Sequence, residues 1–413
     1  MTSLLITNIK GLTGIHPEGT RVLHGAGMKN LPVLENAYLY IEKGRIADFG
    51  LMQDLSPDLR SKNDELDLHG KYLLPAWCDS HTHLVFAASR EEEFVMKIQG
   101  KSYEDIATAG GGILNSARKL QQATESELFD SAWQRLHEVI ALGTGAIEIK
   151  SGYGLTEEAE MKMLRVIRQL KDRSPIPVKA TFLGAHAYPA EFRENHEGYL
   201  KTLINMIPRL AGEGLADYVD VFCEKGFFSL EESARLLETA AKHSLKPKIH
   251  VNQLSVSGGV QLGVEHRAVS VDHLEMMDSE AIQALSGSET IGTLLPSCSL
   301  FLGIPFADAR SLIAANAAVA LASDFNPGST PSGNMNLVVS MACMRLKMLP
   351  EEAINAATIN GAAAMELSAE LGSIEVGKTA NLIVTKHIPS LAYLPYAFGS
   401  NLIDKVIING KIV

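Results

Sequence analysis

The sequence predicts an α/β protein: a (β/α)8 TIM barrel with a small β-sandwich built from both chain termini. Two observations carry this prediction. Through the middle of the 413-residue chain, β-type runs alternate with helix-length amphipathic segments, a pattern typical of parallel βα units. At both ends, short β-type runs are separated by turn residues. Eight parallel strands with intervening helices close into a barrel, and the end segments need a partner because each has too few strands to fold alone.

The barrel is expected to contain eight strands, the first leading into His81 and His83. The other seven are expected at residues 145–150, 178–183, 218–223, 248–251, 268–272, 290–295 and 319–323. Between them, helical patterns occupy residues 126–142, 157–170, 229–243 and 279–285. We therefore expect residues 73–372 to form the barrel domain.

The small β-domain is expected to combine residues 1–72 with residues 373–413. Its first part has strand-like runs near residues 4–7, 37–44, 45–50 and 66–72. Its second part has runs within residues 372–384 and 402–413. We expect these two distant segments to form one composite β-sandwich beside the barrel.

The composition favours a small-molecule partner. Apolar residues make up 46 % of the chain, the net charge is −11, and the basic residues form no long run, which disfavours nucleic acid and anionic membranes. No stretch approaches the roughly 18 apolar residues of a membrane span, and the first residues do not form a secretion signal. The four scattered cysteines, Cys78, Cys223, Cys298 and Cys343, indicate free thiols, so a cytoplasmic protein is expected.

A His-x-His pair ends the first expected barrel strand. In extended chain, residues i and i+2 face the same side, so His81 and His83 can converge on one ion. Such a pair is about as often structural as metal-binding, because histidine serves many roles. The residues at the ends of the other expected strands decide whether the pair is structural or binds a metal.

Further ionisable residues fall at the ends of the other expected strands, where barrel active sites lie. They are Lys150, His186, Glu224, His250, His273 and Asp324. Neutral imidazoles with one carboxylate suit a borderline divalent ion such as zinc or ferrous iron. We expect one ion, with zinc favoured, held by His81, His83, His250 and Asp324, with a position left for water.

In these motifs the chain resembles the amidohydrolase superfamily of metal-dependent hydrolases. The resemblance rests on Asp79-x-His81-x-His83, the later His250 and His273, Asp324, and Gly377–Val384 near the end. Within that superfamily, the chain is similar to the enzymes that open the imidazolone ring in histidine breakdown. The stretches responsible are His81–Arg90, Glu148–Leu155, Phe182–His186 and Ser323–Gly328. This similarity implies hydrolysis of 4-imidazolone-5-propanoate to N-formimidoyl-L-glutamate, a single zinc or iron ion, and a homodimer.

The resemblance gives each candidate residue an expected role. Asp324 can accept a proton from the attacking water and later deliver it to the ring nitrogen, while His273 assists as base or stabilises the oxyanion. Arg90 offers a planar fork to the propanoate carboxylate, although a surface ion pair is the alternative. The other expected substrate contacts are Tyr153, His186, Gln253, Asn326, Gly328 and Ser329.

Gln253 stands three residues after His250, where deaminases of the superfamily carry a glutamate. An amide cannot relay protons, but it can bind a ring N–H and C=O edge, so Gln253 favours amide opening over deamination. Two alternatives remain: a deaminase of an amino-heterocycle, and a non-catalytic scaffold on the same fold. Lys150 could bridge two metals if carboxylated, but we expect it, like Glu224, to lie outside the metal ligands.

Overall fold

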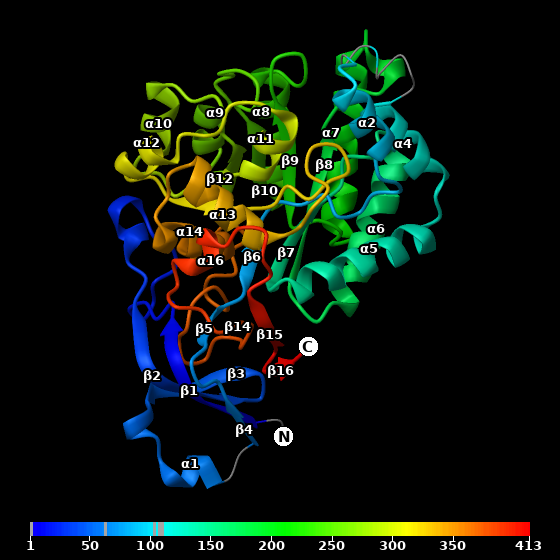
Figure 1. Cartoon of the computed structure of the whole chain (residues 1–413). Coiled ribbons are helices and arrows are strands. Elements are labelled where there is room, and N and C mark those ends of the chain that lie inside the picture. Colours follow the sequence, from blue (N-terminus) through cyan, green and yellow to red (C-terminus); the bar gives the residue numbers. More distant parts are fainter. Residues whose placement is uncertain (1–2, 62–63, 102–104, 106–110) are drawn as a thin grey trace.

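Two β-sheets organise the protein, and they lie end to end in the computed structural model (Figure 1). The structure describes residues 3–61, 64–101, 105 and 111–413. One sheet has eight strands in sequence order and forms the barrel. The other combines strands from both termini, so the N- and C-terminal segments lie side by side at the same end of the molecule.

The barrel strands run parallel, each beside the next one along the chain. They are β6 (Trp77–Asp79), β7 (Thr144–Lys150), β8 (Val178–Ala185), β9 (Tyr218–Cys223), β10 (Lys246–Val251), β11 (Ser270–His273), β12 (Ile291–Leu294) and β13 (Val319–Leu321). The last strand returns to the first through the residues that follow them: Asp324 N donates to His81 O at 3.0 Å, and His83 N donates to Phe325 O at 2.9 Å. The predicted TIM barrel is confirmed.

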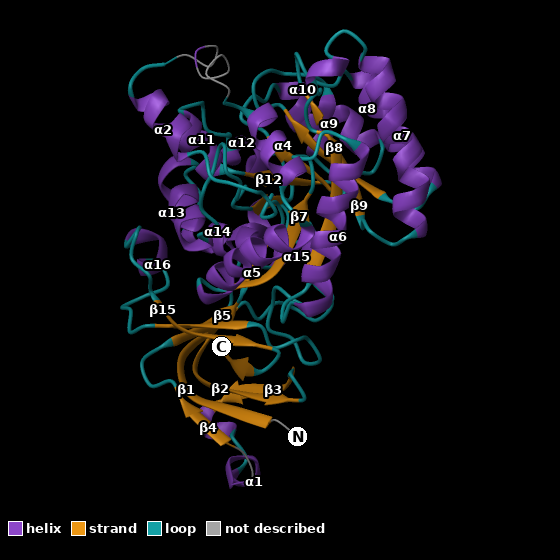
Figure 2. Ribbon diagram, turned by 90° about the vertical axis from the view of Figure 1, so that its right-hand side faces the viewer, coloured by secondary structure: helices purple, strands orange, loops and turns teal. Residues whose placement is uncertain are grey.

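Helices surround the barrel strands, as Figure 2 shows. Their apolar sides pack against β-strands that are buried along most of their length. Two of them, α5 and α8, begin with reciprocal capping boxes at Thr124 and Ser229, which explains their sharp starts. The helices of the barrel region are α2 (Glu91–Ile98), α4 (Ile113–Gln122), α5 (Glu125–Ala141), α6 (Glu157–Arg173), α7 (His196–Gly212), α8 (Leu230–Lys242), α9 (Gly259–Glu265), α10 (Ser279–Leu285), α11 (Pro296–Leu302), α12 (Ala309–Ala314), α13 (Met335–Arg345), α14 (Pro350–Ala357) and α15 (Ile359–Ala363).

The second sheet is mixed and runs in the order β16-β15-β14-β5-β1-β2-β3, with β4 also paired to β1. The strands are β1 (Ser3–Thr13), β2 (Val33–Glu42), β3 (Arg45–Leu51), β4 (Asp64–Asp67), β5 (Tyr72–Pro75), β14 (Leu382–Thr385), β15 (Ile403–Ile408) and β16 (Lys411–Ile412). Short helices α1 (Pro57–Ser61) and α16 (Tyr393–Tyr396) lie in its connections.

This sheet folds over its own apolar core. Ile46 at the start of β3 exchanges backbone hydrogen bonds with Gly377 and Lys378, just before β14. The enclosed side chains include Ile6, Leu39 and Ile407. The predicted small β-domain from both termini is therefore present.

The chain crosses between the two sheets at Ala76 and Trp77. Ala76 N donates to Asn381 O in the terminal sheet, whereas Trp77 N donates to Gly143 O beside the barrel, both at 2.9 Å. Because β5 belongs to the terminal sheet, the structure places the crossing a few residues after the division expected at residues 72 and 73. The domain boundaries themselves stay a prediction.

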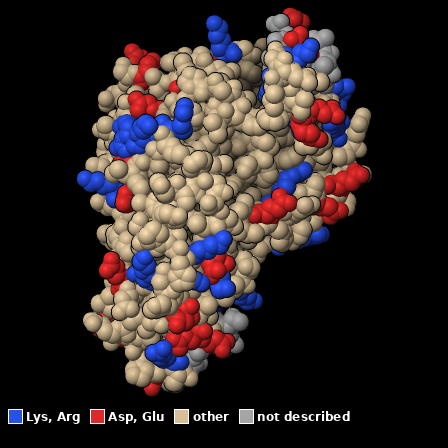
Figure 3. Space-filling view, in the orientation of Figure 1, with Lys and Arg blue, Asp and Glu red and all other residues tan. Residues whose placement is uncertain are grey.

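The surface agrees with the composition. Lys and Arg side chains are interspersed with Asp and Glu over the face shown in Figure 3. Within the described ranges, no helix has the length and apolar character needed to cross a membrane. All four cysteines are free thiols.

Candidate active site

The predicted metal ligands and the predicted catalytic residue His273 lie together at the carboxyl ends of the barrel strands. His81 and His83 follow β6, His250 lies in β10, His273 ends β11 and Asp324 follows β13. His273 and Asp324 have positive φ angles, 90° and 56°, which non-glycine residues rarely adopt. Such strained backbone concentrates at functional sites, and here it occurs where each chain segment leaves its strand.

Three donor atoms converge at the centre of this group. Nε2 of His81 and Nε2 of His83 each lie 3.6 Å from Oδ1 of Asp324. Around a tetrahedral ion with bonds of 2.0–2.1 Å, neighbouring donor atoms stand about 3.4 Å apart. The observed spacing therefore fits one metal ion.

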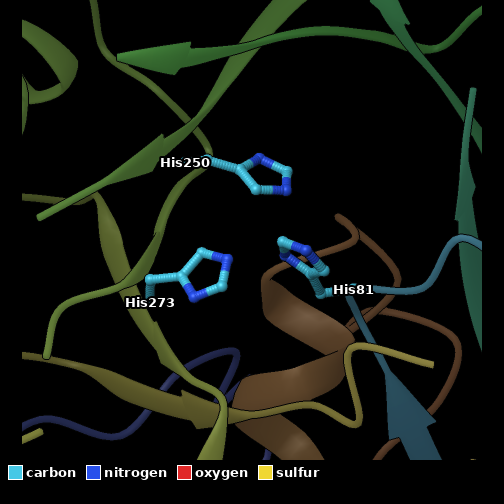
Figure 4. A group of neighbouring side chains, drawn as sticks. All are labelled: His81, His250 and His273. Atoms are coloured by element: carbon cyan, nitrogen blue, oxygen red, sulfur yellow. The ribbon is translucent and has the colours of Figure 1, made fainter. Parts of the chain in front are cut away.

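The side chains of His250 and His273 lie next to that of His81. The rings of His81 and His250 are 4.4 Å apart between centroids, and those of His250 and His273 are 5.3 Å apart. Figure 4 shows His81, His250 and His273 arranged around a common gap, with one ring nitrogen of His273 facing it and the other turned away. Ligand atoms of these three residues lie within 4.8 Å of one another.

Burial keeps the histidines in the form that binds metal. It lowers the pKa of His81, His83 and His250 well below the usual value, and neighbouring positive groups lower it further. The rings are therefore neutral at pH 7 and each offers a lone pair. Burial also lowers the pKa of His186 to about 4 and raises the pKa of Asp324.

Two buried carboxylates stand behind the histidines. Asp272 Oδ2 lies 2.7 Å from Nδ1 of His81, so Nδ1 carries the proton and Nε2 is left for the metal. Asp220 Oδ2 lies 3.0 Å from Nδ1 of His250, although without hydrogen-bond geometry.

A buried lysine holds these carboxylates in place. Lys150 Nζ donates to Asp220 Oδ2 at 2.8 Å and to Glu148 Oε1 at 2.6 Å, and lies 3.6 Å from Asp272 Oδ2. Lys248 also donates to Glu148. Lys150 thus contacts the carboxylates behind the histidines, as expected for a residue outside the metal ligands.

The carboxylate of Glu224 is hydrogen-bonded to the loop that follows β10. Its Oε2 accepts from the backbone N of Leu254 at 3.0 Å, and its side chain also bonds Ser255. Glu224 therefore positions the segment that follows Gln253.

A cavity of about 60 Å³ opens beside the group formed by His83, His250, His273 and Asp324. Its lining contains five residues expected to contact substrate, together with Phe222, which the sequence interpretation missed. The five are Tyr153, His186, Gln253, Asn326 and Ser329.

The polar side chains that line the cavity differ in whether their hydrogen-bonding atoms are already used within the protein. His186 Nδ1 is 3.1 Å from Gly152 O and so carries the proton, which leaves Nε2 as an acceptor. The amide of Asn326, in contrast, already bonds the backbone of Asp324, Gly328 and Ser329. Asn326 therefore shapes the loop more than it offers free donors.

Arg90 and Gly328 lie together beside the cavity rather than in its lining. Arg90 Nε donates to Ser116 Oγ at 3.0 Å and lies 3.6 Å from Glu93 Oε1. Its Nη2 is buried and has no hydrogen-bond partner among the residues the structure describes. A Cβ added to Gly328 would lie 2.2 Å from Arg90 Nη1, so only glycine allows this close approach.

The sequence interpretation missed Asp220, Asp272 and Phe222. A signal existed for two of them: Asp220 and Phe222 share one face of β9 with Glu224, by the alternation of a strand. Asp272 immediately precedes His273, so its side chain points away from that of His273 and its partner could not be read from spacing.

Comparison with known proteins places this fold and site in one class. A sequence profile of the amidohydrolase family matches residues 72–413. The chain belongs to the amidohydrolase family.

Its relatives narrow the class. An imidazolonepropionase from Christiangramia forsetii is 56 % identical over 412 residues, covering 100 % of both chains. Another from Flavobacterium johnsoniae is 55 % identical, covering 99 % of each, and one from Thermoanaerobacter pseudethanolicus is 40 % identical, covering 98 % of this chain and 96 % of the relative. Within the family, the chain groups with the imidazolonepropionases.

Solved structures share the fold at low identity. An adenosine deaminase from Xanthomonas campestris with bound zinc has a TM-score of 0.70 at 17 % identity, covering 100 % of this chain and 92 % of that one. A guanine deaminase from C. acetobutylicum with bound guanine has a TM-score of 0.70 at 15 % identity, covering 100 % of both. These similarities support the fold alone.

Proposed function

We propose that this protein hydrolyses the ring amide of 4-imidazolone-5-propanoate to N-formimidoyl-L-glutamate in histidine degradation. The observation that carries the proposal is the convergence of His81 Nε2, His83 Nε2 and Asp324 Oδ1 beside a cavity lined by Gln253. Full-length relatives named imidazolonepropionase support the same reaction.

The donor set fits one zinc or ferrous ion. His81, His83, His250 and Asp324 would hold it, with zinc favoured, since neutral imidazoles and a carboxylate suit both metals. Nε2 of His81 and Nε2 of His250 are buried without hydrogen-bond partners within the described chain, as expected of metal ligands. Such an ion, when bound, would lower the pKa of a water molecule toward about 7 and so make hydroxide available at neutral pH.

Asp324 and His273 handle protons and charge. Oδ1 of Asp324 faces the histidines, and Oδ2 accepts from Ser329 Oγ at 3.1 Å. Oδ2 is therefore the oxygen that takes the proton of the attacking water and returns it to the leaving ring nitrogen. The ring nitrogen of His273 that faces the gap in Figure 4 donates to the developing oxyanion or assists as base.

Other residues select and orient the substrate. The Gln253 amide binds the N–H and C=O edge of the ring, and Nε2 of His186 accepts from a ring N–H. The unpaired Nη2 of Arg90 donates to the propanoate carboxylate. Tyr153 and Phe222 supply flat faces around the ring.

An assay separates this function from the alternatives. The zinc-loaded protein should consume 4-imidazolone-5-propanoate, seen as loss of the ring absorbance, and chelator-treated protein should not. Release of ammonia from adenine or guanine in place of ring opening would indicate a deaminase, and an absence of any turnover would indicate a scaffold. Either result would reject the proposal.

We also infer a cytoplasmic homodimer acting on a small molecule and not on nucleic acid. Four free thiols fit a reducing compartment, and the net charge of −11 opposes binding to polyanions. Light scattering of the purified protein tests the dimer, and a mass near the 44.6 kDa of one chain would contradict it.

A further inference from the structure

His273 also belongs to a second set of donor residues, together with Glu275 and Cys298. Ligand atoms of these three residues lie within 4.8 Å of one another. All three are buried, with exposed fractions of 3 % for His273, 6 % for Glu275 and 0 % for Cys298. None of the expected reaction steps uses Glu275 or Cys298.

Two buried atoms of this set have no hydrogen-bond partner in the part of the chain that the structure describes. Within the described residues, His273 Nδ1 and Glu275 Oε2 have no hydrogen bond. Nδ1 lies 3.5 Å from Oε1 of Glu275, which accepts from Ser299 Oγ at 3.0 Å. Buried polar atoms are normally paired, so two orphaned atoms beside a thiol indicate a missing ligand.

The donor types select the ligand. Nitrogen, carboxylate oxygen and sulfur together suit borderline and soft ions such as Zn²⁺ or Cd²⁺, whereas Mg²⁺ and Ca²⁺ prefer oxygen alone. The 3.5 Å spacing of Nδ1 and Oε1 is close to the separation of neighbouring ligands on a tetrahedral ion. We propose that His273, Glu275 and Cys298 form a second cation site, which we call the thiol site, and that a thiophilic divalent ion bound there inhibits the enzyme.

A cation bound at the thiol site would affect two residues that take part in the proposed reaction, Gln253 and His273. The Cys298 thiol gives its proton to water as the sulfur–metal bond forms, and it leaves Gln253, whose Nε2 lies 3.4 Å from Sγ. A cation on Nδ1 of His273 displaces any proton from that nitrogen to water and leaves the ring proton on the other nitrogen, the one that faces the gap in Figure 4. His273 then cannot accept a proton there, so turnover falls. This inhibitory effect rests on the proposed function, but cation binding does not.

The test uses protein loaded with one equivalent of zinc and then titrated with Cd²⁺. We expect one zinc and one cadmium per chain after dialysis, an ultraviolet thiolate-to-cadmium absorption band, and at least a tenfold loss of rate. In Cys298→Ser the band should vanish, and at least tenfold more Cd²⁺ should be needed to halve that variant's own rate. Cys343→Ser, which removes a thiol on α13, is the matched control and should behave as the parent.

A Glu275→Gln variant keeps the thiol and should bind Cd²⁺ at least tenfold more weakly. A single bound ion per chain, or a band that survives in Cys298→Ser, would overturn the thiol site, and an unchanged rate in the cadmium-loaded protein would overturn its inhibitory effect. Metal content and absorbance do not need turnover, so they test the site even if the proposed reaction fails.

Discussion

Nδ1 of His81 lies 2.7 Å from Oδ2 of Asp272, and both side chains are completely buried. The carboxylate fixes the tautomer of the imidazole, so Nε2 is always free toward Asp324. Ser270 Oγ and Lys150 hold Asp272 in turn. Buried groups behind His81 therefore fix the direction in which its Nε2 points.

Removing the charge of Asp272 should weaken metal binding. Asp272→Asn keeps the shape but loses the negative charge and exchanges one of the two acceptor oxygens for a donor NH2 group, and loss of such a partner costs about 10–100-fold in metal affinity. Competition with a chromophoric chelator measures this. Asp130→Asn, an exposed change on α5, is the control. Parent-like affinity in Asp272→Asn would show that the carboxylate does not tune the site.

Arg90 should govern substrate affinity more than the rate of the chemical step. Hydrogen bonds to charged groups contribute about 1.5–3 kcal/mol, so Arg90→Ala should lower kcat/KM by about 10–100-fold, mainly through KM. Arg90→Lys should restore little, because lysine lacks the planar fork. Arg193→Ala, an exposed arginine after β8, should leave both constants unchanged. An unchanged KM in Arg90→Ala would remove the carboxylate contact.

Gly328 offers an independent check of the same contact. A methyl group there would lie 2.2 Å from Arg90 Nη1 and must displace the guanidinium. Gly328→Ala should therefore raise KM with no change in metal content, as measured by steady-state kinetics and metal analysis. A parent-like KM would mean that the position of Arg90 does not matter.

Asp324→Asn should reduce kcat by at least about 100-fold, because proton transfer by a positioned group contributes 10²–10⁴-fold. The circular dichroism spectrum should remain that of the parent. Rates are to be compared at equal metal occupancy, since Asp324 is also a proposed ligand. Near-normal kcat would reject Asp324 as the proton carrier.

The metal-free protein should lose stability in mild acid. Burial lowers the pKa of His186 to about 4, whereas an unfolded histidine takes up its proton near pH 6.5. Between these values the unfolded chain binds more protons, so the free energy of unfolding decreases as the pH falls from about 6.5 toward 4. Urea unfolding of the parent and His186→Gln at pH 7 and pH 5 measures this. The variant should show the smaller decrease, and equal decreases would contradict a buried, neutral His186.

The fold can be predicted from the sequence because each strand has a recognisable pattern of residues over a short stretch of chain. The run at residues 145–150 is apolar enough to mark a buried strand, and the observed β7 covers it. His81 and His83 are recognisable because they lie two positions apart, with only Thr82 between them. The pairing of β14 with β5 was less accessible, since more than 300 residues separate their sequences and only the core they share joins them.

Side-chain partnerships were harder to predict. Asp272 and Lys150 look like strand residues, and the contacts of Asp272 with His81 and of Lys150 with Asp272 depend on the closed barrel. Asn326 lines the cavity, and its amide also bonds Gly328 and Ser329 of its own turn, so its contact with substrate stays a prediction. The crowding of Arg90 against Gly328 similarly depends on two loops meeting in space.

Anomalous diffraction from crystals of zinc-loaded protein, collected on both sides of the zinc edge, tests the central claim most directly. The account predicts one strong peak within bonding distance of His81 Nε2, His83 Nε2, His250 and Asp324 Oδ1. A map with no peak among these four side chains, recorded from protein that turns over substrate, would contradict it.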